Sequence, residues 1–315
     1  MKRIVIAGGS GFLGRVLAAY FHEHGYAITI LTRSPKMPSN GAREIGWDAR
    51  TVGDWAQELD GATAVINLVG RSVDCRYHER NRKLILASRV DSTRAMGEAI
   101  AKCKTPPWVW LNASTATIYK HNFGPAWDEL GEIGGTPEAN DAFSIEVATA
   151  WERTLNEMPT PDTRKVAMRA AMVLGTAKNS VFPMLGRLTC FGLGGKMGDG
   201  KQFVSWIHEK DFCRAVEWLI AHDELNGAIN IAAPHPITNA EMMKLFREAC
   251  GIPVGLPATK WMLKIGAFFL RTETELMIKS RRVVSRRLAE SGFTFCFPFL
   301  RLALEDLLAR RRLHE

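Results

Sequence analysis

The 315-residue sequence predicts an α/β fold: a doubly wound parallel sheet followed by a smaller, mainly helical C-terminal subdomain. Short apolar runs of strand length alternate with longer segments of helical periodicity through the first part of the chain. A glycine-rich turn separates the first such strand from the first such helix. Together these observations indicate a sheet of the Rossmann type, with helices on both faces.

The glycine turn follows the apolar run 4–7 and opens an amphipathic segment that begins at Phe12. Gly8 permits a tight turn, Gly11 lets the backbone approach a pyrophosphate, and Gly14 lets the helix pack against the strand. Free amides at the helix start then face the anion. The alternative is a structural turn in an α/β domain that binds no nucleotide. The predicted phosphate-binding residues are Gly8, Ser10, Gly11, Phe12, Leu13 and Gly14.

The second strand, 26–32, ends in Thr32-Arg33-Ser34. Sites selective for NAD usually carry an acid ~20 residues beyond the glycines, where it binds the ribose 2′-hydroxyl. A guanidinium flanked by hydroxyls instead binds a 2′-phosphate. The sequence therefore favours NADP(H), with Thr32 and Arg33 at the 2′-phosphate. The alternative is an ordinary surface arginine after a strand.

The remaining strands and helices of the sheet follow in order. A short strand over 44–48 places Asp48 where an acid contacts adenine, and the strand 64–70 ends in Leu68, Val69 and Gly70 at the ligand-binding edge. The other expected elements are a helix over 79–102, a strand over 108–112, a segment 113–119 crossing the edge, an irregular loop 124–140, a helix over 141–157 and a strand over 166–169.

Beyond Gly175 the pattern changes. Loop glycines at 192–195 and 198–200 precede an expected strand at 203–208, a helix over 211–222, a strand over 228–231 and a helix capped by Thr238. We therefore expect an NADP-binding domain over 1–175, to which 209–232 returns. Residues 176–208 and 233–315 form the substrate-binding, mainly helical subdomain.

Composition narrows the function classes. The net charge of +8 is concentrated at 281–282, 286–287 and 310–312, on segments expected to be amphipathic helices, and no nucleic-acid motif accompanies it. The apolar stretch 261–270 contains a lysine and is too short to span a bilayer. Six scattered cysteines fit neither a zinc site nor a disulfide framework. We expect a cytoplasmic protein with no metal, nucleic-acid or membrane partner. Its oligomeric state is left open.

The glycine turn, the edge at 67–70, the run 114–119 and Arg169-x-x-x-Val173-Leu174-Gly175 resemble an extended short-chain dehydrogenase/reductase. The stretches 88–93, 192–195, 200–208 and 291–295 resemble its atypical "epimerase family protein" subfamily, which has a C-terminal helical module. The resemblance implies NADP(H) held by the glycine turn, Thr32-Arg33, Leu68-Val69 and Arg89. It implies no particular substrate.

Typical members of the superfamily carry Tyr-x-x-x-Lys on the helix after the fifth strand. The phenol exchanges the proton that accompanies hydride transfer, and the ammonium lowers the phenol's pKa. In this chain Phe143 and Val147 stand at those positions, and neither side chain transfers a proton. The same subfamily commonly lacks the pair.

Three residues are candidates to assist proton transfer instead. Thr115 matches the superfamily's substrate-binding hydroxyl, with Ser114 beside it at the cofactor edge. Tyr119 leaves the strand near the expected nicotinamide position, and His208 has a side chain whose pKa suits proton exchange. The alternatives are strand-end capping by residues 114–117 and a structural hydrogen-bonded role for His208.

Two functions fit these observations. The first is an NADP(H)-dependent oxidoreductase or epimerase acting on a small carbonyl or sugar-like substrate. The second is a non-catalytic NADP(H)-binding sensor or scaffold protein, which the missing Tyr-Lys pair favours.

Overall fold

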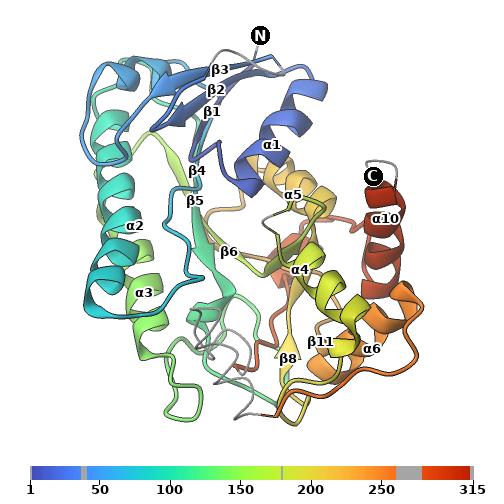
Figure 1. The fold of residues 1–315 in the computed structure, drawn as a ribbon. Helices are drawn as coiled ribbons and strands as arrows, with labels where there is room; N and C mark the ends of the chain where they lie inside the picture. Colours follow the sequence, from blue (N-terminus) through green and yellow to red (C-terminus); the bar gives the residue numbers. More distant parts are fainter. Residues whose placement is uncertain (1, 37–40, 179, 260–278, 313–315) are drawn as a thin grey trace.

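A seven-stranded parallel sheet forms the centre of the molecule (Figure 1), with strand order β10-β6-β5-β4-β1-β2-β3. The structure, a computed structural model, describes residues 2–36, 41–178, 180–259 and 279–312. The strands of the sheet are β1 (Arg3–Ala7), β2 (Ala27–Thr32), β3 (Ala42–Gly46), β4 (Ala64–Asn67), β5 (Val109–Thr115), β6 (Arg164–Ala170) and β10 (Gly227–Ile231).

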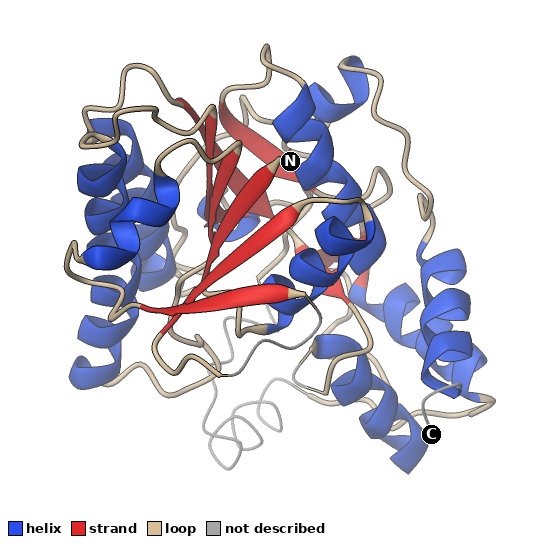
Figure 2. Ribbon diagram, turned by 90° about the horizontal axis from the view of Figure 1, so that it is seen from above, coloured by secondary structure: helices blue, strands red, loops and turns tan. Residues whose placement is uncertain are grey.

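Helices cover both faces of this sheet (Figure 2). Helices α1 (Phe12–Glu23) and α5 (Glu209–Ala221) pack on one face, where Leu17 and Phe212 share a buried cluster with Ile4 and Ile6 of β1. Helices α2 (Glu79–Ile100) and α3 (Ala142–Glu157) pack on the other, which the remaining β1 side chains face. Strand β1 is fully buried from residue 4 onward, because alternate side chains enter two cores. The predicted doubly wound fold is confirmed.

A second group of elements lies beyond the carboxyl edge of the sheet. Its core brings together Phe182, Phe246 and Leu304 from three helices. The elements outside the main sheet are η1 (Asp54–Leu59), η2 (Ala116–Ile118), β7 (Met172–Leu174), α4 (Val181–Leu188), the π-helical turn η3 (Thr189–Leu193), β8 (Phe203–Val204), β9 (Trp206–His208), β11 (Ile237–Thr238), α6 (Asn239–Cys250), α9 (Arg286–Glu290) and α10 (Leu300–Arg312). No helix within the described ranges is long and apolar enough to cross a membrane. The predicted stretch 261–270 lies outside the described residues.

Residues 279–285, here called the strap, join this second group to the sheet. The strap is extended and bonds at both ends to the loop after β5. The backbone amides of Trp127 and Val284 donate to the carbonyls of Arg282 and Trp127 at 2.7 and 2.9 Å. The Ser280 hydroxyl also accepts from the Phe203 amide at 2.9 Å. The carboxyl edge is therefore closed on one side by residues from the last 40 positions of the chain.

Several predicted elements differ in detail. The strand expected at 203–208 divides at Ser205, because β8 pairs with β11 whereas β9 pairs with β7. Helix α5 begins two residues earlier than expected, where the His208 side chain caps it. Residues 192 and 193 belong to the π-helical turn rather than to a loop. Arg281 and Arg282 lie in the strap rather than on a helix.

Candidate functional site

The glycine turn brings backbone atoms of two strand ends together at the carboxyl edge. Gly8 has a φ of +77°, and a Cβ there would lie 3.1 Å from the Leu68 carbonyl carbon and the Val69 amide nitrogen. A Cβ on Gly14 would lie 2.4 Å from the Cα of Gly9. The turn from β1 to α1 therefore requires glycine at both positions, and at Gly14 the close neighbour is the turn itself rather than the strand.

The start of α1 has no side-chain cap. Gly11 is its N-cap residue and offers no side-chain acceptor to the first amides. A Cβ on Gly11 would meet only the Gly8 carbonyl oxygen, at an ordinary 3.4 Å. The first amides of the helix, at Phe12 and Leu13 and onward, lack intrahelical acceptors and suit an anion such as a pyrophosphate. Beside them, the Ser10 carbonyl accepts from the Arg15 guanidinium at 2.8 Å.

Arg33 is exposed immediately after β2, and no other side chain in the described residues bonds to its guanidinium. It shares the wall of an open hollow of about 760 Å³ with Asp48. The Thr32 hydroxyl accepts from the Ser34 amide at 3.5 Å, which fixes the turn that carries Arg33. An unpaired guanidinium at this edge suits a phosphate.

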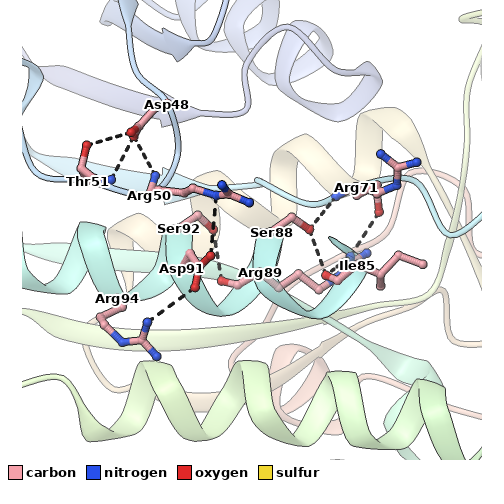
Figure 3. Close-up of polar contacts among 10 residues, drawn as sticks. All are labelled: Asp48, Arg50, Thr51, Arg71, Ile85, Ser88, Arg89, Asp91, Ser92 and Arg94. Atoms are coloured by element: carbon pink, nitrogen blue, oxygen red, sulfur yellow. Dashed lines mark hydrogen bonds and ion pairs between the residues drawn. The ribbon is translucent and has the colours of Figure 1, made fainter. Parts of the chain in front are cut away.

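Strand β3 ends at Gly46, so Asp48 lies in the following turn rather than on the expected strand. Its carboxylate accepts from the Arg50 and Thr51 amides at 2.8 and 2.9 Å and from the Thr51 hydroxyl at 2.8 Å (Figure 3). Backbone hydrogen bonds from Thr51 and Arg50 hold the pKa of Asp48 below its usual value. The carboxylate thus stays ionised while it organises its own turn.

Arg89 reaches from α2 to the loop after β4 (Figure 3). Its guanidinium donates to the carbonyls of Arg71 and Ile85, both at 3.1 Å, and lies 5.0 Å from the ring centre of Trp151. A Cβ on Gly70 would lie 3.2 Å from the guanidinium carbon, so glycine permits this approach. No carboxylate of the described residues pairs with Arg89, and burial lowers its pKa to about 10. A desolvated cation without a counter-ion indicates an anion site.

A buried polar cluster supports the loop between β4 and α2. Asn67 accepts from the Val69 amide at 3.1 Å and donates to the Asn112 side-chain oxygen at 2.8 Å. Thr93 donates to the same oxygen at 3.3 Å. Leu68 and Val69, both half-buried, are thereby held against the Gly8 turn.

Ser114 and Thr115 are the last two residues of β5, which extends three residues beyond its predicted end. The buried Ser114 hydroxyl donates to Glu152 Oε1 at 2.5 Å. Glu152 also accepts two bonds from the Arg169 guanidinium, at 2.8 and 2.7 Å. The half-buried Thr115 hydroxyl accepts from the Thr117 amide at 3.1 Å, which leaves its proton available to donate.

Tyr119 lies at the far end of the same network. Its hydroxyl accepts from Arg169 and donates to Asn230, both at 2.8 Å, and the residue is 1 % exposed. Burial raises the pKa of Tyr119, against the opposing charge and hydrogen bond of Arg169. With its hydroxyl occupied on both sides inside the core, the expected catalytic role of Tyr119 does not fit this placement.

His208 is also fully buried. Its Nδ1 accepts from the Lys210 amide at 3.0 Å, which caps α5, and its Nε2 lies 3.1 Å from Asp306 on α10. Burial and the charge of Arg310 lower the pKa of His208 to about 4, despite the opposing effect of Asp306. The side chain joins α5, which packs on the sheet, to α10 of the second group, so the structural alternative fits better than proton transfer.

Sequence reasoning missed Glu152 and the Asn67–Asn112 pair. Both lie on elements that were predicted, and both are buried polar groups with partners far away in the chain. The available signal was a charged residue at an inward position: Glu152 falls directly after Trp151 on the face of α3 that packs on the sheet.

The sheet topology, the glycine turn and the cationic edge define a nucleotide-binding α/β protein of the Rossmann type. The chain belongs to the NAD dependent epimerase/dehydratase family, which it matches over residues 4–232. Residues 258–307 match a domain of unknown function, DUF1731. The resemblance drawn from the sequence motifs is confirmed.

Individual relatives match nearly the whole chain. An epimerase family protein of Staphylococcus saprophyticus is 30% identical over 98% of this chain and 100% of its own. The crystal structure of human epimerase family protein SDR39U1 with NADPH is 28% identical, with a TM-score of 0.84 over 97% of this chain and 98% of that one. A nucleoside-diphosphate sugar epimerase from Corynebacterium glutamicum is 27% identical, with a TM-score of 0.76 over 98% of this chain and 58% of its own.

Proposed function

We propose that this chain is an NADP(H)-dependent oxidoreductase or epimerase acting on a small carbonyl or sugar-like substrate. The observation that carries the cofactor assignment is the exposed, unpaired Arg33 at the end of β2, where a carboxylate would select NAD. The human relative crystallised with NADPH supports the same assignment. When bound, NADP(H) supplies a hydride donor or acceptor.

The residues at the edge have separate tasks in this proposal. The amides after Gly11 hold the pyrophosphate, Thr32 and Arg33 bind the 2′-phosphate, and Asp48 borders the adenine. Leu68, Val69 and Gly70 line the cofactor from the β4 side, where Arg89 supplies a second positive charge. Each of these residues lies at the carboxyl edge or on the helix next to it.

Thr115 is the residue we assign to the substrate. Ser114 has committed its proton to an ionised carboxylate, so it offers only an acceptor, which suits a cofactor hydroxyl or amide. Thr115 offers a hydrogen-bond donor instead, because its oxygen already accepts from the Thr117 amide. Its free proton can polarise a substrate carbonyl, although an unactivated threonine is a weak acid.

One observation favours the second candidate, a non-catalytic NADP(H)-binding sensor. Phe143 and Val147, at the Tyr and Lys positions of typical relatives, are buried in an apolar cluster with Ile85, Val73 and Tyr77. The rings of Tyr77 and Phe143 lie 5.0 Å apart. The loop after β4 therefore covers the place from which the usual pair would act.

The cofactor assignment is tested by titrating NADPH and NADH into the full chain and into Arg33→Gln. Loss of charge-assisted bonds to a phosphate costs about 1.5–3 kcal/mol, so NADPH affinity should fall about 10- to 100-fold while NADH affinity is unchanged. Arg43→Gln is the matched control, because Arg43 lines the same hollow but is already paired with Glu58 at 3.3 Å. An equal effect of both substitutions would refute the assignment.

The two functions are separated by Thr115→Val and Thr115→Ser. NADPH oxidation is followed with a panel of aldehydes, ketones and nucleotide sugars. The enzyme proposal predicts turnover with at least one compound, lost in Thr115→Val and retained in Thr115→Ser, with NADPH affinity equal in all three proteins. NADPH binding without turnover anywhere in the panel favours the sensor.

A further inference from the structure

A second hollow, of about 240 Å³, lies among α4, α6 and α10, in the second group of elements. Its walls are mostly apolar, with Phe182, Phe246 and Leu304 among them. Two of its lining residues are cysteines, Cys190 and Cys250. They come from different elements, 60 positions apart in the chain.

Both side chains line the same hollow, and Cys190 lies close enough to act on the Cys250 thiol. Cys190 lies on the π-helical turn, and Cys250 is the last residue of α6. The segments that follow them are also bonded to each other: the Leu256 amide donates to the Gly192 carbonyl at 2.8 Å, and the Gly195 amide donates to the Leu256 carbonyl at 3.2 Å. These two bonds hold the segments that follow the cysteines against each other.

We infer that Cys190 and Cys250 form a reversible redox site, which closes into an intramolecular disulfide when a low-molecular-weight disulfide is the oxidant. A disulfide requires Cβ atoms about 4 Å apart. Both cysteines line one hollow of about 240 Å³, so the adjustment that closes the bond is a local one. Cys250 is the last residue of α6 and Cys190 lies in the short π-helical turn, where small adjustments cost least. The inference is independent of the proposed function.

The order of reaction follows from exposure. Cys190 is exposed, whereas Cys250 is half-buried. Burial and the neighbouring Cys190 raise the pKa of Cys250 to about 11, while the Arg311 cation opposes this rise. Cys190 therefore reacts first and Cys250 second.

In the first step the Cys190 thiolate attacks one sulfur of the small disulfide, forms a mixed disulfide and releases one small thiol. The Cys250 thiolate then attacks the Cys190 sulfur and releases the second small thiol. Two protein thiols are oxidised and one small disulfide is reduced to two thiols. A dithiol reductant reverses both steps.

The experiment treats the reduced full chain with oxidised glutathione, quenches with acid, alkylates the remaining thiols after denaturation and digests the protein for mass spectrometry. All six cysteines are free in the structure. We expect alkylated thiols to fall from six to four, a linked peptide pair containing Cys190 and Cys250, and return to six after treatment with dithiothreitol.

Variants distinguish the pair from general oxidation. Cys250→Ser should accumulate a glutathione adduct on Cys190 that the wild-type chain resolves, and Cys190→Ser should leave Cys250 alkylatable. Cys296→Ser is the matched control, because Cys296 is also exposed but does not line the hollow, and the variant should still form the link. Persistent separate adducts on Cys190 and Cys296 in the wild-type chain, with no linked peptide, would overturn the inference.

Discussion

The hydroxyl of Ser114 lies 2.5 Å from Oε1 of Glu152, so a residue at the cofactor edge is tied to a buried ion pair. Glu152 and Arg169 share two hydrogen bonds, and both side chains are about a tenth exposed or less. Burial alone would lower the pKa of Arg169, but Glu152 outweighs it and holds that pKa above its usual value. The buried Glu152–Arg169 pair thus fixes the Ser114 hydroxyl as a donor to Glu152.

We predict that Glu152→Gln lowers the free energy of unfolding by about 3–5 kcal/mol, because it leaves Arg169 buried without its counter-charge. Urea denaturation provides the measurement. Glu79→Gln is the control: it breaks an exposed pair with Lys83, also at 2.7 Å, and should change stability by less than about 1 kcal/mol. If Glu152→Gln lowered the free energy of unfolding as little as Glu79→Gln does, Arg169 would have found another partner in the variant.

Two glycines of the phosphate turn should respond differently to alanine. A methyl group on Gly14 meets backbone at 2.4 Å, so Gly14→Ala should lower the melting temperature as well as NADPH affinity. On Gly11 it meets only an ordinary contact at 3.4 Å. In such turns the second glycine is where the backbone approaches the pyrophosphate. Gly11→Ala should therefore keep the melting temperature within a few degrees and lose at least about tenfold in NADPH affinity. Unchanged NADPH affinity in Gly11→Ala would place the phosphates elsewhere.

Arg89→Met removes the half-buried cation while keeping much of the side chain's length. If the cation serves a bound anion, NADPH affinity should fall about tenfold, the effect of roughly 1.4 kcal/mol. Arg94→Met, on the same helix, removes an exposed arginine that pairs with Asp91 at 3.5 Å (Figure 3) and should leave affinity unchanged. Fluorescence titration of both variants decides whether the guanidinium acts on the cofactor or only on the loop at Arg71.

His208 should give stability a specific pH dependence. Its pKa is about 4 in the folded chain and ordinarily about 6.5, so between these values the unfolded chain binds a proton that the folded chain does not. The free energy of unfolding should therefore be highest above pH 6.5 and fall by up to roughly 3 kcal/mol as the pH approaches 4. The carboxylates of Asp306 and Asp211 and the cation of Arg310 face the ring and set this balance.

Denaturation at a series of pH values tests the assignment with His208→Asn, which keeps a capping side chain for α5. The variant should show a flatter profile between pH 4 and 6.5. His78→Asn is the control, because His78 also caps a helix, α2, but is exposed. A wild-type slope in the His208 variant would assign the pH dependence to other groups.

The sequence predicted the sheet well because its signals are local. The apolar run of β1, the glycine turn and the helix after it follow one another within 20 residues, and their periodicity indicates burial directly. The capping role of Thr238 was equally local and is confirmed by its bond to the Glu241 amide. Arg33 was assigned to the 2′-phosphate only from its position directly after the second strand.

The side-chain chemistry of the site was less accessible. Tyr119 looked available because it follows a strand at the ligand edge, but its partners Arg169 and Asn230 lie 50 and 111 residues away. His208 likewise meets Asp306 across 98 residues. Such pairings depend on tertiary packing, which periodicity does not encode. The cytoplasmic location, the division into domains and the absence of nucleic-acid, membrane and metal partners stay predictions.

The strap has a consequence for how the chain folds during synthesis. The Lys279 ammonium, fully buried, pairs with Asp141 at 2.5 Å and donates to the Thr117 carbonyl at 2.7 Å, 162 residues away. Contacts of such sequence separation raise contact order and slow folding. Residue 279 must leave the ribosome before the turn that presents Thr115 is braced, so the nascent sheet emerges with an open edge that needs protection from aggregation.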